Sequence, residues 1–306
     1  MELSSAENTS LTRCSSTETS WIAEMVAKYH STAKKNDAII IHGASNSSSP
    51  PDLLSWLIAS KIREKTGKPA KSIVVSGKLE MVGMGGGSAN TVISVAEHYG
   101  IGFLLNPDPM SLVPKEDRPR EKWSSRWTWG FKKHAELGTL MPSLTGVSNT
   151  AMVQRSAYLK PELYTKDFTY TELMPAPNAF AGMLITTITK FVVLLLALSP
   201  FRKLIKKVSF EPGQGPDWQE NAKKESVSMD AVGEGEDGTK VRGKFEWKGA
   251  VVHVSAVLVA EAAGVLLEME KRGETKGRGG VQTPSFLGEA LVEKLRGAGC
   301  VFDIAE

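Results

Sequence analysis

The sequence contains few of the residues that form disulfides or metal sites. Its 306 residues include only two cysteines, Cys14 and Cys300, near opposite ends of the chain. This arrangement fits neither a disulfide framework nor a CxxC metal site, and it favours a reducing compartment. The five histidines are also widely scattered, without the paired spacing of a zinc site. We therefore expect no metal and a cytoplasmic location, with or without attachment to a membrane or lipid surface.

A strong excess of charge of one sign is also missing. The chain has 37 Lys and Arg against 34 Asp and Glu, a formal net charge of +3. That excess is too small to indicate a nucleic-acid partner, and no nucleic-acid-binding motif accompanies it. Residues 1–20 are rich in Ser, Thr and Glu and lack the apolar run of a signal peptide, so we expect a disordered leader.

Two common catalytic motifs are absent as well. There is no GxSxG nucleophile elbow and no GxGxxG dinucleotide fingerprint. A glycine cluster occurs at Gly83, Gly85, Gly86 and Gly87, but Ser88 stands where a third fingerprint glycine would follow, and no P-loop lysine is present. We therefore interpret this cluster as a turn before a helix capped by Ser88 and ended by Gly100, rather than as a phosphate site.

Hydrophobic periodicity predicts alternating helices and strands. Helical spacing covers 21–35, with Ser20 as its N-cap, and the apolar run 38–41 predicts a buried strand. The remaining predictions are a helix after Asp52, a strand over 72–76, a strand over 241–247, a helix over 254–271, a helix from Thr283 and Pro284 to Leu295, and a strand over 300–304.

Two segments have no clear period and are predicted to be loops. One, 106–138, is rich in Pro, Trp and charge, and its Trp123, Trp127 and Trp129 are more typical of residues that pin a loop than of a ligand cage. The other, 213–238, is polar, acidic and rich in glycine. We expect it to be a loop or a mobile linker.

The longest apolar stretch is 179–198, with Lys190 as its only charge. Its length approaches that of a bilayer span, although the central lysine leaves insertion only marginally favourable. After Pro200, segment 201–208 alternates apolar and basic residues as a helix in a membrane interface does. A buried helix followed by a surface helix with a solvated basic face accounts for the pattern equally well.

The loop 42–52 is the best candidate site. It leaves the carboxyl end of the predicted strand 38–41, where open α/β sheets bind ligands, and enters a helix. Ser47, Ser48 and Asp52 offer two hydroxyls and a carboxylate there. The alternative is plain helix capping by Asp52 and Ser49.

The order of several motifs resembles a known family. The segments WIAEMVAKYHSTAKKNDAIIIH, SPPDLLSWL, GGGSANT, LGTLMPSLTGVSNTAMVQRSAYL, FTYTELM, EPGQGP, VAEAAGVLL and GGVQTPSFLGEALVEKLRGAGCVFDI together resemble the saccharopine dehydrogenase-like oxidoreductases, which include trans-acting enoyl reductases. The more specific part is Asn149 and Thr150 followed by Val153, Arg155 and Ser156. The chain departs from the family in its loop, which reads Ser45, Asn46, Ser47, Ser48 where a Gly, Phe, Asp, Ser run is usual.

The resemblance implies an α/β fold in which a truncated Rossmann-like part joins an α/β substrate domain with a mixed sheet. Residues 21–67 would be the remnant of the nucleotide-binding domain, and 68–279 the substrate-type domain with the hydrophobic helix 179–198 and the basic segment 201–208. Residues 280–306 would return a helix and a strand to the nucleotide-domain sheet. Because family members begin with a strand and GxGxxG, the chain is expected to start near the last third of that domain.

The function implied by the resemblance is reduction of an activated double bond or imine by NADPH in polyketide or lipid-type secondary metabolism. The expected partners are a small-molecule or carrier-bound polyketide or acyl substrate, a polyketide synthase, a membrane surface at 179–208, and a second copy in a homodimer. Asn149 would position polar atoms and Arg155 would hold an anionic group, although an Arg155 paired with a carboxylate is at least as plausible. The alternative is a family remnant without redox activity, serving as a binding scaffold or a cofactor-independent enzyme.

Overall fold

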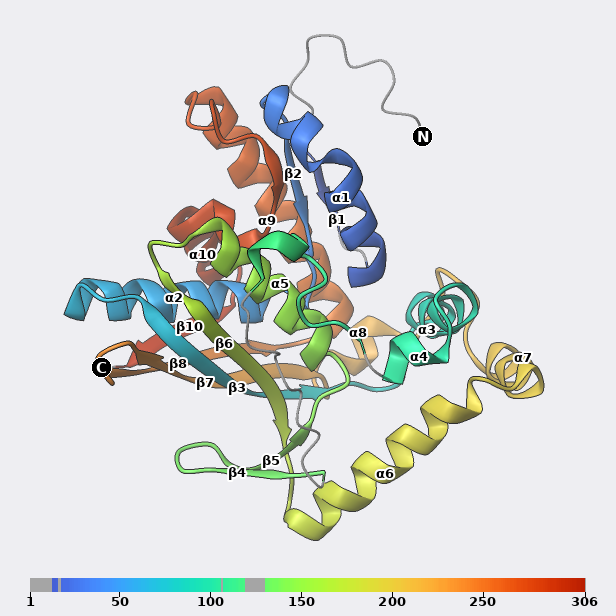
Figure 1. Ribbon diagram of the computed structural model, residues 1–306. Coiled ribbons are helices and arrows are strands. Elements are labelled where there is room, and N and C mark those ends of the chain that lie inside the picture. The colour runs from blue at the N-terminus through green and yellow to red at the C-terminus, as the bar shows by residue number, and fades with distance from the viewer. Residues whose placement is uncertain (1–12, 16–17, 106, 119–129, 306) are drawn as a thin grey trace.

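The computed structural model describes residues 13–15, 18–105, 107–118 and 130–305, and it contains two sheets with helices packed between and around them (Figure 1). The smaller sheet is parallel, with the order β1 (Arg13–Ser15), β2 (Ile39–His42) and β9 (Gly280–Gln282). The larger sheet is mixed, with the order β10 (Val301–Ala305), β8 (Lys240–Lys248), β7 (Ser226–Gly235), β3 (Ala70–Glu80), β6 (Tyr164–Pro175), β5 (Gly138–Pro142) and β4 (Lys132–His134). The predicted α/β class with a mixed sheet is confirmed.

Ten α-helices and two 3-10 helices complete the described part of the chain. They are α1 (Thr19–Lys35), α2 (Ser49–Thr66), α3 (Gly86–His98), α4 (Ile101–Leu105), η1 (Lys115–Asp117), α5 (Gly146–Leu159), α6 (Ala179–Leu195), α7 (Ser199–Val208), α8 (Trp218–Asn221), α9 (Val251–Lys271), η2 (Pro284–Leu287) and α10 (Gly288–Gly297). Most of the predicted helices and strands are therefore found, with ends displaced by a few residues.

Helix α2 packs mainly on β7 and β8 of the larger sheet and lies in the main hydrophobic core. Leu53, Leu54, Ile58 and Ile62 are fully buried on this helix. Glycines on β7 and β8 let the helix approach, because a Cβ added to Gly233 would lie 2.3 Å from a methyl carbon of Ile58. The opposite face of β8 is charged, as the alternation in its sequence predicts.

The larger sheet curls so that its far hairpin returns over this charged face. The turn between β4 and β5 places Glu136 against β8, four strands away in the sheet order. Its carboxylate accepts hydrogen bonds from Lys240 at 3.0 Å and from Arg242 at 2.7 Å. These bonds hold the hairpin against the sheet.

The amino-terminal end of the described chain is more ordered than predicted. Arg13–Ser15 pairs in parallel with β2, so part of the expected leader 1–20 is a strand. The remainder of that leader up to residue 12 lies outside the described residues. The N-cap prediction was also wrong, since Glu18 occupies that position and Ser20 lies buried inside the first turn of α1.

Two predicted loops contain strands. Segment 106–138 includes β4, and its Trp123, Trp127 and Trp129 lie outside the described residues. Segment 213–238, predicted to be a loop or linker, contains β7, which lies inside the larger sheet between β3 and β8. The acidic residues of β7 belong to its exposed face, while Val227, Met229 and Ala231 are buried in the core.

The carboxyl-terminal strand was predicted on the wrong sheet. Strand β9, which was not predicted, joins β2 in the smaller sheet. Strand β10, however, pairs antiparallel with β8 of the larger sheet over five residue pairs. The ring of Phe302 packs against Phe245 with centroids 4.9 Å apart, so burial of this aromatic pair favours the observed partner.

Two helical regions of the described chain satisfy a length and hydropathy test for a membrane span. The first is α9, whose Val254, Leu258, Val265 and Leu266 are buried in the core. The second is α6 together with α7, whose axes are bent by 105°. Helix α6 is not the buried helix that was one alternative, because most of its large apolar side chains are exposed.

Gly233 tests the packing of α2 on the sheet. We expect Gly233→Val to lower the free energy of unfolding by about 1–3 kcal/mol, because the added atoms would overlap Ile58 in a filled core. Chemical denaturation measures the change. The control is Gly264→Ala in α9, where a Cβ meets nothing within 4 Å and a gain of about 0.5–1 kcal/mol is expected. Equal effects of the two variants would contradict this packing.

Candidate functional site

The predicted site loop lies where expected, between the carboxyl end of β2 and the start of α2. Ser49 donates a hydrogen bond to Gly43 O at 3.0 Å, and the hydroxyls of Ser45 and Ser47 are 3.1 Å apart. Across the loop, Ser255 of α9 donates to Asn46 Oδ1 at 2.7 Å. The loop is therefore held at both sides, with Asn46 and Ser47 its more accessible residues.

Asp52 lies at the centre of one buried polar cluster, which we call the Asp52 cluster: Asp52, Ser156, Thr283 and Ser285. The Ser156 hydroxyl donates to Asp52 Oδ1, and the backbone N–H of Ser285 donates to Oδ2 at 2.7 Å. The hydroxyls of Ser156 and Thr283 are 2.6 Å apart. The cluster thus joins α2, α5 and the segment that follows β9.

Burial raises the pKa of the Asp52 carboxyl, and its hydrogen bonds from Ser156 and Ser285 only partly offset that effect. The side chain does not cap α2, because its oxygens bind groups of other segments. Ser49 does not cap the helix either, since its hydroxyl donates to Gly43 O. Neither capping alternative is therefore observed. Asp52 instead connects α2 with α5 and with the segment after β9 through hydrogen bonds.

A second polar cluster, the Glu172 cluster, contains the buried residues Ser48, Asn149, Tyr170 and Glu172 and the exposed Thr145. The Asn149 amide donates to both carboxylate oxygens of Glu172 at 2.9 Å. Tyr170 donates to Glu172 Oε2 at 2.9 Å, and Thr145 donates to Oε1 at 3.0 Å. Ser48 donates to Asn149 Oδ1 at 3.3 Å, which connects this cluster to the site loop.

Burial raises the pKa of Glu172 above its ordinary value, against the lowering effect of these hydrogen bonds. Its side chain is 6% exposed, but Thr145 beside it is exposed. A carboxyl group with a raised pKa near the surface can hold and donate a proton. The Glu172 cluster is therefore the part of the site that is suited to acid–base chemistry.

Arg155 lies on another side of α5 and is 1% exposed. It donates to Leu112 O at 2.8 Å and to Val281 O at 2.6 Å, and it lies 3.1 Å from His30 Nδ1. Burial lowers its pKa to about 10, so the guanidinium stays charged at neutral pH. Its described partners are carbonyls and an imidazole rather than a carboxylate, and they tie α1, α5 and β9 together.

The structure thus brings Ser48 and Asn149 together and places Ser47 on the same loop, whereas Arg155 is separate. Binding of substrate by these residues and by Asp52 stays a prediction. Glu172 was not among the site residues predicted from the sequence. The available signal was its position on the inward face of β6, two residues after Tyr170, where a charged residue is unusual.

Neither the glycine cluster 83–87 nor the start of α2 has the open backbone N–H groups that would hold the pyrophosphate of a dinucleotide. Helix α3 starts at Gly86 rather than being capped by Ser88, and the Gly86 N–H donates to Gln214 O at 2.9 Å. A Cβ on Gly86 would lie 2.2 Å from the carbonyl oxygens of Phe210 and Glu211. The glycines therefore accommodate neighbouring backbone. The start of α2 contains two prolines, which have no N–H to offer an anion.

A depression of about 400 Å³ lies elsewhere, on the charged face of the larger sheet. Its lining includes Ser76, Glu136, Asp230, Arg242, Lys244 and Asp303. Several of these charges are paired, as in the ion pairs of Arg242 with Glu136 and of Lys244 with Glu246. None of the residues predicted for the site lines this depression.

Comparison with known proteins gives a distant relationship. No protein-family model matches the chain. It is 25% identical over 293 residues to the trans-acting enoyl reductase of Mycobacterium tuberculosis (strain ATCC 25618 / H37Rv), an alignment that covers 89% of this chain and 69% of that protein. The trans-acting enoyl reductase of Mycobacterium bovis (strain BCG / Pasteur 1173P2) gives the same values. The chain is thus distantly similar to trans-acting enoyl reductases, in agreement with part of the predicted resemblance.

The raised pKa of Asp52 predicts how stability depends on pH. A carboxyl whose folded-state pKa is raised binds its proton more tightly when folded, so its contribution to stability falls as pH rises from its unfolded pKa to its folded pKa. We expect Asp52→Asn, which cannot ionise, to be more stable relative to the unmodified protein at pH 7 than at pH 4. Denaturant unfolding across this range measures the difference.

The control for this experiment is Asp237→Asn. Asp237 is exposed, and hydrogen bonds from Thr239 lower its pKa, so its contribution is lost as pH falls and the relative stability of this variant has the opposite trend. If the relative stability of Asp52→Asn changed with pH in the same direction as that of the control, the pKa of Asp52 would not be raised in the folded protein.

The contacts of Arg155 predict a structural effect. We expect Arg155→Lys to lower the free energy of unfolding by about 1–3 kcal/mol. The single ammonium of lysine cannot reproduce the two-pronged hydrogen bonding of the guanidinium, so one buried carbonyl is left unsatisfied. Thermal and denaturant unfolding measure this. Arg242→Lys, at an exposed position, is the matched control and should change stability by about 0.5 kcal/mol or less. An unchanged stability for Arg155→Lys would show that the contacts with Leu112 and Val281 are dispensable.

Proposed function

We propose that this chain has an enoyl reductase-type function on a carrier-bound acyl or polyketide substrate, with the reacting part of the substrate at the Glu172 cluster. The observation that carries the proposal is the distant similarity to trans-acting enoyl reductases over 89% of the chain. The name of those relatives also motivates a polyketide synthase as the partner. NADPH is proposed as the reductant on resemblance alone.

The chemistry proposed for the chain's own residues is proton donation. Reduction of an α,β-unsaturated thioester adds a hydride to one carbon and a proton to the other, and a nicotinamide cofactor would supply the hydride. The raised pKa of Glu172 suits the proton donor, and Asn149 orients its carboxyl through two hydrogen bonds of 2.9 Å. Because the glycine cluster 83–87 and the start of α2 are not open to a pyrophosphate, we assign no residue to the cofactor.

A second candidate is a binding protein without redox activity, or an enzyme that needs no cofactor. The observation in its favour is that Gln214 accepts the Gly86 N–H and that the backbone of Phe210 and Glu211 fills the space beside this glycine. In this case the Glu172 cluster would bind a ligand or transfer a proton without a reductant.

An absorbance assay of NADPH with an α,β-unsaturated acyl thioester tests the first proposal. We expect thioester-dependent oxidation of NADPH, and we expect Glu172→Gln to lower kcat about 10²–10⁴-fold with a smaller change in KM, because it removes the proton donor. Asp303→Asn, in the depression on the charged face, is the matched control and should leave both constants unchanged.

Each other outcome has a defined meaning. If NADPH is not oxidised and gives no saturable fluorescence change, while the thioester still protects the fold against heat, the redox proposal fails and the second candidate is supported. If Asp303→Asn rather than Glu172→Gln abolishes turnover, the Glu172 cluster is not the site.

A further inference from the structure

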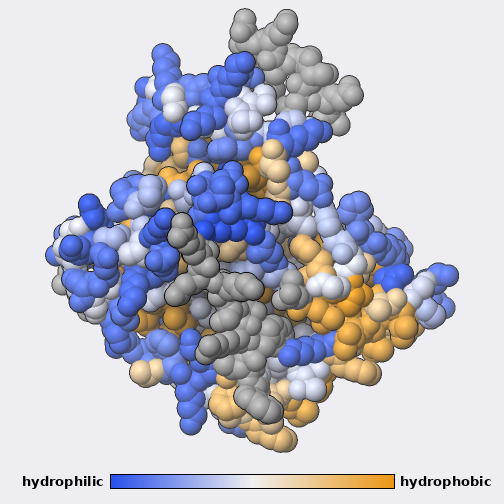
Figure 2. Space-filling view, viewed as in Figure 1, coloured by the Kyte–Doolittle hydropathy of each residue, from blue (hydrophilic) through white to orange (hydrophobic). Residues whose placement is uncertain are grey.

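The surface of α6 is apolar over an unusually wide arc. Its exposed large apolar residues, with a mean exposure close to one half, are Phe180, Met183, Leu184, Ile185, Ile188, Phe191, Val192 and Leu194. At 100° per residue they cover an arc of about 200°. Gly182 and Thr186 are the only buried residues of the helix. Figure 2 shows apolar side chains gathered over α6 and the adjacent ends of α3, α4 and α7.

Helix α7 follows at 105° to α6 and is amphipathic. Its outer apolar residues include Leu204 and Val208, which are 56% and 74% exposed, and Phe210 continues this surface just beyond the helix. Its basic residues are Arg202, Lys203, Lys206 and Lys207. Together α6 and α7 form an apolar corner with cations along one of its helices.

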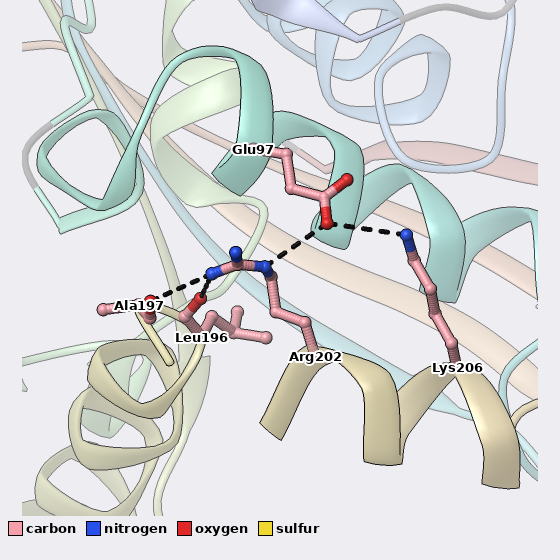
Figure 3. Close-up of polar contacts among 5 residues, drawn as sticks. All are labelled: Glu97, Leu196, Ala197, Arg202 and Lys206. Atoms are coloured by element: carbon pink, nitrogen blue, oxygen red, sulfur yellow. Dashed lines mark hydrogen bonds and ion pairs between the residues drawn. The ribbon is translucent and has the colours of Figure 1, made fainter. Parts of the chain in front are cut away.

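Polar contacts hold this corner in a fixed shape (Figure 3). Arg202 Nη1 donates to Leu196 O at 2.6 Å and to Ala197 O at 3.0 Å, which satisfies carbonyls at the end of α6. Glu97 of α3 accepts from Arg202 at 3.3 Å and from Lys206 at 3.5 Å. The bend is therefore preorganised against α3.

The two other lysines of α7 are available to an external anion. Lys203 and Lys207 are exposed, and within the described residues neither has an ion-pair partner. They lie on the helix that follows α6, beside the exposed Leu204 and Val208. Apolar surface next to unpaired cations is complementary to a bilayer whose headgroups are anionic.

The width of the arc favours lipid over a protein groove. A groove that binds a helix covers one stripe at i, i+3, i+4 and i+7, whereas Met183, Leu184 and Ile185 are consecutive and all exposed. A full span is less consistent with the geometry, because 17 residues reach only about 26 Å and the helix then bends away.

We propose that the corner of α6 and α7 attaches the protein to an anionic membrane surface. The apolar side chains of α6 and the outer face of α7 enter the acyl-chain region, and Lys203 and Lys207 contact lipid phosphates. This inference is independent of the proposed catalytic function, since the corner shares no residue with the Glu172 cluster.

Flotation of the full chain with vesicles tests the attachment. We expect binding to phosphatidylcholine vesicles that contain phosphatidylglycerol, and Lys203→Gln with Lys207→Gln should weaken it about twenty-five-fold, at about fivefold for each lysine. Ile188→Glu with Phe191→Glu should abolish flotation, because two charges would enter the acyl-chain region. On vesicles of phosphatidylcholine alone, the lysine variant should bind as the unmodified chain does.

Matched controls use exposed residues outside α6 and α7. Val252→Glu on α9, 62% exposed, controls for the added charge, and Lys65→Gln with Lys276→Gln controls for the lost lysines. Both should float as the unmodified chain does, and circular dichroism should show the same melting for all variants. Failure of the unmodified chain to float would overturn the proposal. So would a dimer in sedimentation that Ile188→Glu with Phe191→Glu dissociates without any vesicle binding, since the corner would then be an interface between copies.

Discussion

The Asp52 carboxylate joins three segments that are far apart in the sequence, and the position of the candidate site depends on it. One oxygen accepts from Ser156 on α5, and the other accepts from the backbone of Ser285. A buried carboxyl needs such partners, because an unsatisfied one would destabilise the fold strongly. The bond to Ser285 also fixes the chain just after β9, so the smaller sheet is connected to the helices that cover the larger one.

Helices α2 and α5 also position part of the Glu172 cluster. Ser48 and Asp52 are four residues apart at the start of α2, and Asn149 and Ser156 are seven apart on α5, so each pair lies on one helix face. Fixing Asp52 to Ser156 therefore aligns Ser48 with Asn149, at a hydrogen-bond distance of 3.3 Å. Asn149 in turn orients Glu172 on β6. The Asp52–Ser156 contact and the Glu172 carboxyl are thus linked through the packing of α2 on α5.

Much of the fold follows from local patterns in the sequence, and its failures have specific causes. The alternation of Val241, Gly243, Phe245 and Trp247 with charged residues predicted β8 correctly, because one face of the strand is buried and the other faces solvent. Strand β7 was missed because its glycines and acidic residues are typical of a loop, although the glycines make room for α2. The partner of β10 could not be predicted, since it depends on the contact of Phe302 with Phe245, residues that are far apart in the sequence.

The candidate site was predictable only in part. The loop after the buried strand is found at the predicted place and carries Ser47 and Ser48, and Ser48 contacts Asn149 of α5, whereas Asp52 belongs to a separate cluster. Arg155 was expected either to hold an anionic group or to pair with a carboxylate. Its guanidinium binds backbone carbonyls instead, and the sequence does not distinguish these partners. Glu172 was missed because its importance arises from burial beside Asn149, which only the packing of β6 on α5 creates.

Hydrogen exchange with and without an α,β-unsaturated acyl thioester tests the central claim that ligand binds at the Glu172 cluster. Amides protected by a bound ligand should lie in three places: the loop 43–48, the start of α5, and β6 near Glu172. Protection confined to β8 and β10, around the depression on the charged face, would contradict the account.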